Sequence, residues 1–219
     1  MASGVRCCSP RTRAVLARVP GLVLGLVLFG VGIALKIRSG LGLSPWDAFH
    51  QGLSRHLPLS IGLVTILVSG LVLLAWIPLR QRIGVGTMLN AVLVGVTMDA
   101  TLRVVGETGV LWLRWAYLLV GVGLIGVGSG LYIGARLGPG PRDGVMMGLA
   151  AKGLSVRLAR FLIEGTALVA GWLMGGVVGV GTVVFAVLIG PVIQFFLRIF
   201  DRGPIEIAGS APLRLRGAE

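Results

Sequence analysis

The sequence predicts an all-α polytopic membrane protein built from two homologous halves, and three observations lead to this prediction. First, 55% of the 219 residues are apolar and 13% are charged, whereas a soluble domain needs about a quarter of its residues charged. Second, six segments are apolar and long enough to cross a bilayer. Third, the second half of the chain repeats the first. Disordered chains and cysteine-based disulfide or zinc scaffolds are excluded, because the two cysteines are adjacent.

The apolar segments each contain roughly 20 residues, the length that crosses the hydrocarbon core of a bilayer. They cover residues 18–37, 61–79, 83–104, 112–134, 158–177 and 178–200. We interpret the first as a retained span and not a cleaved signal, because Lys36-Ile-Arg38 follows it in place of an Ala-x-Ala site. Trp76 and Trp112 lie at span ends, which predicts anchoring at the membrane interface.

The internal duplication is the strongest signal in the chain. Residues 25–56 and 121–152 share 13 identities in 32 positions, and residues 59–95 and 154–190 share 15 in 37. The shared positions include several glycines and both Pro-x-Asp motifs, at 45–47 and 141–143. The sequence therefore predicts two membrane repeats, 18–104 and 112–200, flanked by cytoplasmic segments 1–17 and 201–219.

Each half reads as span, short Pro-x-Asp segment, span, span. The short segments, about 45–57 and 141–153, would form helices of roughly 18–20 Å, too short to cross. Three crossings per half would invert the second half relative to the first, as in many transporters. Six crossings place 15 Lys and Arg inside and five outside, and eight crossings place 14 inside and six outside. Charge therefore does not separate the two topologies, and helix length favours six crossings with both termini in the cytoplasm.

The Pro-x-Asp segments carry the main candidate site residues. Ser44 or Gly140 at the cap, Pro45 or Pro141 at the first position and an acid at the third together start a helix. That structural role is one interpretation. The other is that Asp47 and Asp143 approach a shared ion or substrate site from opposite sides of the membrane. The two interpretations are compatible.

The Gly-Val-Gly-Thr motifs open the third and sixth spans. Small residues at these positions predict close helix packing, and a backbone-lined pathway is the alternative. They lack the Lys-Ser/Thr of a phosphate loop, so they do not predict nucleotide binding. The residues concerned are Gly84, Gly86, Thr87, Gly179, Gly181 and Thr182.

Two further residues are candidates for ion binding. Glu164 lies inside the fifth span, where a carboxylate is costly and is therefore a functional candidate. Arg160 lies four residues earlier and could instead pair with it. His50, beside Asp47 on the first short segment, is a candidate titrating group. A metal site is not predicted, because the second repeat has Met146 and Lys152 in place of His50 and His56.

The motifs also resemble a known family. Gly40-Leu-Gly-Leu-Ser-Pro-Trp-Asp47, Leu137-Gly-Pro-Gly-Pro-Arg-Asp143-Gly and Ile83-Gly-Val-Gly-Thr87 resemble the YczE/YyaS/YitT group of bacterial integral membrane proteins, and the YczE-like branch most of all. The resemblance covers roughly residues 18–200. It implies a multi-pass protein of the bacterial cytoplasmic membrane and implies no particular mechanism.

The function that these features favour is a small secondary-transporter-like permease with an ion or small-solute site between the repeats. The alternative is a non-transporting membrane scaffold or regulatory partner. The sequence does not predict an enzyme, since it has neither a His-Glu-x-x-His motif nor a nucleophile elbow. We expect no cofactor, no bound metal and no nucleic-acid partner. The expected partners are the lipid bilayer, a small solute or ion and, as a possibility, further copies of the chain.

Overall fold

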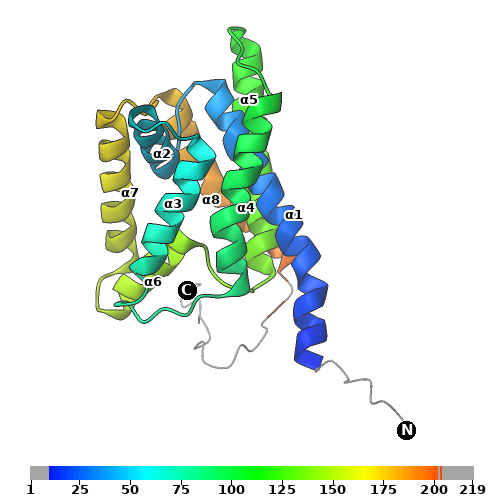
Figure 1. Cartoon of the computed structure of the whole chain (residues 1–219). Coiled ribbons are helices and arrows are strands. Elements are labelled where there is room, and N and C mark those ends of the chain that lie inside the picture. Colours follow the sequence, from blue (N-terminus) through cyan, green and yellow to red (C-terminus); the bar gives the residue numbers. More distant parts are fainter. Residues whose placement is uncertain (1–9, 202, 204–219) are drawn as a thin grey trace.

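Eight α-helices form the part of the chain that the computed structural model describes, residues 10–201 and 203 (Figure 1). No strand occurs within these residues. The helices are α1 (Pro10–Ser39), α2 (Pro45–His56), α3 (Ile61–Leu74), α4 (Val85–Val104), α5 (Leu111–Gly134), α6 (Pro141–Ala151), α7 (Val156–Leu173) and α8 (Val180–Phe200).

Most helix boundaries lie within a few residues of the prediction, and both Pro-x-Asp segments form separate short helices. Two boundaries differ. The first helix begins at Pro10, so residues 10–17, which we expected to lie outside any helix, continue it by two turns. The helix of the second apolar segment ends at Leu74 and is followed by turns. The expectations for residues 1–9, 202 and 204–219 lie outside the described residues.

Four helices are long and apolar enough to cross a membrane: α1, α4, α5 and α8. A fifth span results if α2 and α3, which are bent by 113° at a short break, count as one. The 14 residues of α3 are short for a span. The 18 residues of α7 include Arg157, Arg160 and Glu164. The chain is therefore a helical membrane protein with four to five spans by length and composition.

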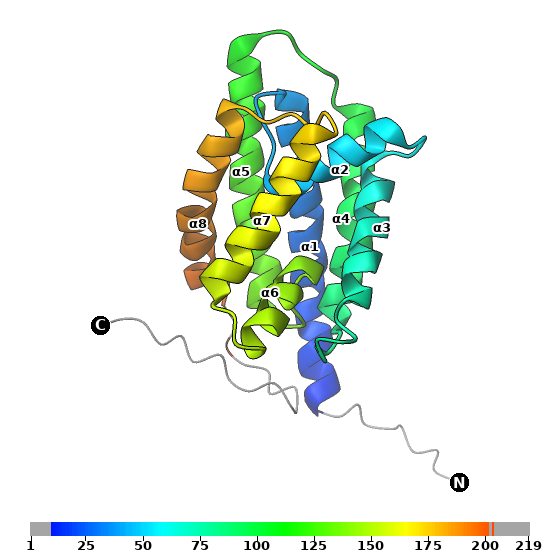
Figure 2. The ribbon, with the colours of Figure 1, turned by 90° about the vertical axis from the view of Figure 1, so that its left-hand side faces the viewer.

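The long helices α1 and α5 run side by side in opposite directions at the centre of the molecule (Figure 2). Helix α4 packs against α1, and α8 packs against α5. The short helix α2 lies at one end of the bundle and α6 at the other, and the described chain begins and ends at the α6 end (Figures 1 and 2). Helix α7 packs against α2, and α3 packs against α4.

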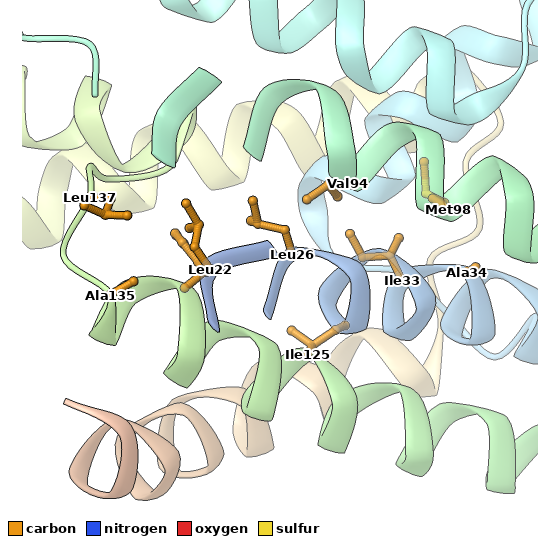
Figure 3. Close-up of a cluster of buried hydrophobic side chains, with 10 residues drawn as sticks. Leu22, Leu26, Ile33, Ala34, Val94, Met98, Ile125, Ala135 and Leu137 are labelled. Carbon is orange, nitrogen blue, oxygen red and sulfur yellow. The ribbon is translucent and has the colours of Figure 1, made fainter. Parts of the chain in front are cut away.

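A buried apolar cluster joins α1, α4 and α5 (Figure 3). Leu22 and Leu26 of α1 are fully buried, and Met98 of α4 is 1% exposed. These helices are mainly apolar, and their buried side chains therefore pack closely against one another. Its described members are Leu22, Leu26, Ile33, Ala34, Val94, Met98, Ile125, Tyr132, Ala135 and Leu137.

Glycines bring α1 and α5 into backbone contact. A Cβ atom built on Gly25 would lie 2.8 Å from the Gly128 carbonyl oxygen, and one built on Gly32 would lie 2.6 Å from that of Gly121. The reverse contacts, from Gly128 to Gly25 and from Gly121 to Gly32, measure 2.5 and 2.7 Å. Small residues permit such close approach of membrane helices. The four glycines therefore fix the antiparallel α1–α5 pair.

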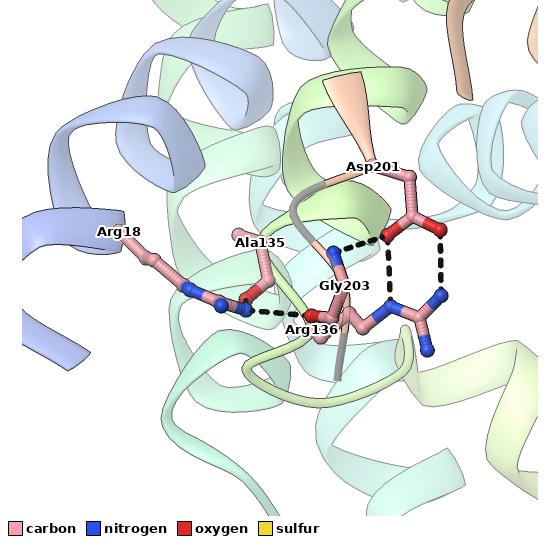
Figure 4. A network of polar contacts seen from close by, with 5 residues as sticks. All are labelled: Arg18, Ala135, Arg136, Asp201 and Gly203. Atoms are coloured by element: carbon pink, nitrogen blue, oxygen red, sulfur yellow. Dashed lines mark hydrogen bonds and ion pairs between the residues drawn. The ribbon is translucent and has the colours of Figure 1, made fainter. Parts of the chain in front are cut away.

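Polar contacts close the α6 end of the bundle (Figure 4). Arg136 donates to both carboxylate oxygens of Asp201, at 2.9 and 2.6 Å. These hydrogen bonds hold the pKa of the Asp201 carboxyl below its ordinary value. Arg18 of α1 donates to the carbonyl oxygens of Ala135 and Gly203. The ends of α5 and α8 are thereby tied to α1.

Candidate functional site

Asp47 at the start of α2 forms a buried ion pair with Lys36 of α1. The Lys36 Nζ atom lies 2.6 Å from Asp47 Oδ2, and the two residues are 0% and 3% exposed. The Lys36 ammonium also lies 3.7 Å from the ring centroid of Phe185 on α8, a cation–π contact. A charge pair buried among apolar helices is costly unless it is well partnered, so this pair marks the site.

The residues around Asp47 start the helix and also hold its carboxylate. Helix α2 begins at Pro45 with Ser44 at the cap position, as the sequence predicts. The Ser44 hydroxyl makes no capping bond to the backbone and instead donates to Asp47 Oδ2 at 2.5 Å. The cap and the ion pair therefore form one network.

Asp143 occupies the equivalent position at the start of α6. This helix begins at Pro141 with Gly140 at the cap position. The Tyr132 hydroxyl of α5 donates to Asp143 Oδ2 at 3.2 Å. In the sequence alignment Tyr132 is equivalent to Lys36, so each Pro-x-Asp carboxylate contacts the same position of its preceding long helix. Asp143 differs from Asp47 in being exposed.

The two short helices meet through Trp46 and Arg142, which are also equivalent positions. The Arg142 guanidinium carbon lies 4.9 Å from the centroid of the Trp46 ring. Arg142 interacts electrostatically with both Asp47 and Asp143. The two sequence-predicted carboxylates thus lie within electrostatic range of one arginine, which pairs directly with neither of them in the described part of the chain.

His50 is buried one turn further along α2. Its Nδ1 atom lies 3.1 Å from the Thr65 hydroxyl, which itself donates to the Ile61 carbonyl at 2.9 Å. The His50 Nε2 atom is buried without a hydrogen-bond partner among the described residues. The direct partner of His50 is Thr65 and not Asp47.

Glu164 lies on α7 beside an apolar cavity. Arg160 donates to its carboxylate at 3.0 Å, the pairing that the spacing allows. Glu164 also interacts electrostatically with Arg142, which connects it to the site. The cavity is widely open on one side, measures about 380 Å³ and lies between α2 and α7. Its lining residues are Trp46, Phe49, Leu162, Ile163, Thr166, Ala167 and Ala170.

The Gly-Val-Gly-Thr motifs contact the Leu-Gly loops before the short helices. Gly86 N donates to the Leu137 carbonyl at 3.0 Å, and Gly181 N donates to the Leu41 carbonyl at 2.8 Å. The remaining residues of the two motifs take part in the same contacts. Gly84 touches Leu137 and Gly179 touches Leu41, while Thr87 donates to the Pro139 carbonyl and Thr182 accepts a hydrogen bond from Gly179 N.

Two loop glycines are required at these contacts. Gly42 has a φ of +138° and Gly138 a φ of +134°, a region that residues with a side chain rarely adopt. A Cβ atom on either would lie 2.7 Å from the hydroxyl of Thr182 or Thr87, respectively. The loops and motifs therefore fit together in the same way at both ends of the molecule.

The outer contacts of α2 and α6 also correspond. A Cβ on Gly52 would lie 2.8 Å from the Met174 Cβ, and one on Gly148 would lie 2.8 Å from the Leu79 Cβ. Trp76, at the position equivalent to Gly171, is 1% exposed and donates to the Pro141 carbonyl at 2.9 Å. The prediction that Trp76 anchors the membrane interface is therefore wrong, because its indole packs against α6.

Sequence reasoning missed three residues of the site: Lys36, Arg142 and Tyr132. Lys36 follows the first apolar stretch and was used only as evidence against a cleaved signal, although a lysine at the end of an apolar span is itself a candidate for a functional role. Arg142 aligns with Trp46, and Tyr132 aligns with Lys36. Inspection of the aligned positions at which the two repeats differ could therefore have found these residues. Within residues 10–201 and 203, no group of three or more His, Cys, Asp or Glu is close enough to hold a metal ion.

The chain matches known proteins over most of its length. Residues 16–198 match a family model described as a family of unknown function (DUF6198). An uncharacterized protein of Haemophilus influenzae is 40% identical over 184 residues, covering 84% of each chain. The uncharacterized membrane protein YczE of Bacillus subtilis is 38% identical over 176 residues, covering 79% of this chain and 82% of YczE.

A third relative extends the comparison. The uncharacterized protein YyaS of Bacillus subtilis is 31% identical over 187 residues, covering 82% of this chain and 92% of YyaS. No solved structure matches the chain. The resemblance to YczE and YyaS that the glycine and Pro-x-Asp motifs predict is confirmed, and the chain belongs to the DUF6198 family of membrane proteins.

Proposed function

We propose that this protein is a small secondary-transporter-like permease of the bacterial cytoplasmic membrane, with an ion or small-solute site between two inverted repeats. One observation carries the proposal: the starts of the two short helices meet. Trp46 and Arg142 touch, and Arg142 acts on both Asp47 and Asp143. Helix ends that meet within the membrane form substrate and ion sites in transporters.

Matching contacts support the inverted arrangement. Gly25 is equivalent to Gly121, and Gly32 is equivalent to Gly128. The contact Gly25–Gly128 therefore corresponds to the contact Gly121–Gly32 when the two halves are exchanged. Helices α1 and α5 are the equivalent first spans, and they run antiparallel (Figure 2). A two-fold axis between them, parallel to the membrane, accounts for both facts. Three crossings per repeat, with α2 and α6 at opposite ends, fit this axis.

The cost of the buried charges supports a functional role for the site. Lys36 and Asp47 are among the most buried residues of the chain, and an ion pair in such a place contributes little net stability compared with apolar side chains. Charged groups inside membrane helices characteristically mark ion and substrate pathways. If the pair served only for packing, apolar residues in its place would stabilise the bundle at a lower desolvation cost.

Cysteine labelling tests the six-crossing topology. In a variant whose native cysteines are replaced, single cysteines at Pro58 and Gly109 are expected to react with an impermeant maleimide added outside intact cells. Cysteines at Gln81 and Lys152 are expected to react only after the cells are opened, because they lie at the α6 end. If the cysteine at position 81 reacted from outside and the cysteine at position 58 did not, the short helices would cross the bilayer.

Flux through proteoliposomes tests the permease itself. Currents on a solid-supported membrane and uptake of labelled solute into proteoliposomes are both recorded after jumps in protons, Na⁺, K⁺, chloride, phosphate, amino acids and carboxylic acids, so that electroneutral transport is also detected. At least one is expected to give a flux that falls about tenfold or more in Asp47→Asn and Asp143→Asn, because each variant removes a site charge. Glu107→Gln, which alters an exposed carboxylate, is the control and is expected to retain the current.

The same experiment separates the permease from the scaffold. A folded wild-type protein that gives neither current nor solute uptake with any member of the panel contradicts the permease and favours a scaffold or regulatory partner. A current that survives in the Asp47→Asn/Asp143→Asn double variant removes these carboxylates from the transport site.

A further inference from the structure

Arg142 differs from the other charged groups of the site in having no direct ionic partner. Lys36 pairs with Asp47 at 2.6 Å, and Arg160 pairs with Glu164 at 3.0 Å. Within the described residues, the Arg142 guanidinium makes no hydrogen bond and no ion pair, and it lies over the Trp46 ring, 4.9 Å from its centroid. It is half-buried and stacked, so five N–H donors are held in place without an acceptor.

A fixed guanidinium of this kind favours an anion. Its planar fork matches the two oxygens of a carboxylate. Stacking on an aromatic ring already restricts the side chain, so less conformational entropy is lost when an anion binds. Arg142 also lies at the second position of α6, where the helix dipole favours negative charge.

The apolar cavity lies next to this guanidinium. Trp46 lines the cavity, and the Arg142 guanidinium stacks on its ring. Ile163 lines it from α7 and is adjacent in sequence to Glu164, whose charge acts on Arg142. With a volume of about 380 Å³, the cavity is in the range that accepts a small organic molecule. Its lining is mainly apolar, and the Thr166 hydroxyl is already bonded to the Leu162 carbonyl.

We propose that Arg142 and the cavity beside Trp46 bind an organic carboxylate with an apolar body, and that Asp143 takes up a proton when it binds. This assignment rests on the proposed permease function and names its substrate class and coupling ion. The carboxylate accepts hydrogen bonds from Arg142, and the apolar body fills the space between α2 and α7.

Charge balance is the reason for the proton. Arg142 is partly compensated through space by Asp143, which is exposed and shares no ion pair. An anion bound at Arg142 would lie near this carboxylate, one residue further along α6, and like charges at short range repel. A proton on Asp143 removes the repulsion and leaves the total charge unchanged. The titratable and charged groups acting on Asp143 are Tyr132 from α5, Arg142 from its own helix and Arg160 from α7.

Equilibrium binding to nanodisc-embedded protein tests the inference separately from transport. The probe is 2-naphthoate, and the comparison ligands are acetate, which lacks the apolar body, and 2-naphthylmethanol, which lacks the charge. Titration calorimetry with empty nanodiscs as reference is expected to show 2-naphthoate binding at least tenfold more tightly than either. Lowering the pH from about 8 to about 6 is expected to tighten its binding, because protonation of Asp143 and anion binding favour each other.

Four variants distinguish the roles of the residues. Arg142→Gln is expected to weaken 2-naphthoate binding about 10- to 100-fold, the scale of a charge-assisted hydrogen bond. Thr166→Trp, which fills the cavity from an exposed position, is expected to abolish binding. Asp143→Asn is expected to bind as tightly as the wild type or more so, without the pH dependence. Arg157→Gln changes an exposed arginine in the first turn of α7 that does not line the cavity, and this control is expected to bind normally.

The outcomes separate this inference from the permease. Equal affinity for naphthoate and the alcohol, or full binding by Arg142→Gln, overturns the carboxylate site even if another solute gives a current. Retained pH dependence in Asp143→Asn overturns the coupling role of Asp143. Naphthoate binding that needs Arg142, without uptake of naphthoate into proteoliposomes, supports the site and contradicts the permease.

Discussion

Lys36→Met is expected to lower the free energy of unfolding by about 3–5 kcal/mol, because it leaves a buried carboxylate without its cation. Lys36 is 0% exposed and Asp47 is 3% exposed, with 2.6 Å between Nζ and Oδ2. The Ser44 hydroxyl that remains bonded to Asp47 cannot neutralise its charge. Unfolding by SDS in mixed micelles, followed by tryptophan fluorescence, measures the change.

Two controls identify the unpaired charge as the cause. The double variant Lys36→Met/Asp47→Asn is expected to recover most of the lost stability, because it removes both charges and keeps the approximate volume. Arg136→Gln breaks an exposed ion pair with Asp201 and is expected to cost less than about 1 kcal/mol. If the single and double variants are equally destabilised, lost packing and not the buried charge explains the effect.

Gly128→Leu is expected to be the second severe change, with a loss of about 3 kcal/mol or more. A Cβ atom at this position would lie 2.5 Å from the Gly25 carbonyl oxygen and 2.8 Å from the Phe29 backbone nitrogen. Backbone atoms cannot turn aside as a side chain can, so α1 and α5 would have to separate along the central contact of the bundle. The yield of monodisperse protein and its SDS unfolding midpoint report the loss.

The same helix supplies a matched control. A Cβ atom on Gly123 of α5 would meet no atom within 4 Å, so Gly123→Leu adds the same apolar side chain without a collision. It is expected to fold with a stability close to that of the wild type. Comparable damage from both substitutions would show that α5 tolerates no leucine, and would argue against the glycine contact as the cause.

Much of the helical organisation could be predicted from sequence because it depends on local signals. Apolar length places the long helices, and proline after a cap position starts α2 and α6 at Pro45 and Pro141. The start of α1 at Pro10 could not be placed in this way, because residues 10–13 are Pro-Arg-Thr-Arg and hydropathy marks only the part of a helix that faces lipid.

The candidate site was only partly predictable. Asp47 and Asp143 stood out because they recur at equivalent positions, and the structure places both near Arg142. The partners of Asp47 and His50, which are Lys36 and Thr65, lie on other helices. No spacing along one segment encodes such a contact, since it depends on how α1, α2 and α3 pack.

The sequence by itself determined a basic, glycine-rich membrane protein of eight helical segments, with paired Pro-x-Asp motifs and membership of one family. Composition, local helix signals and repeated motifs are properties of neighbouring residues, and they can be read before folding. Only the tertiary structure decided that Trp76 is buried against α6, that Lys36 neutralises Asp47 and that Arg142 remains without an ionic partner. Each of these facts depends on distances between helices far apart in the chain, which close packing of the whole bundle sets.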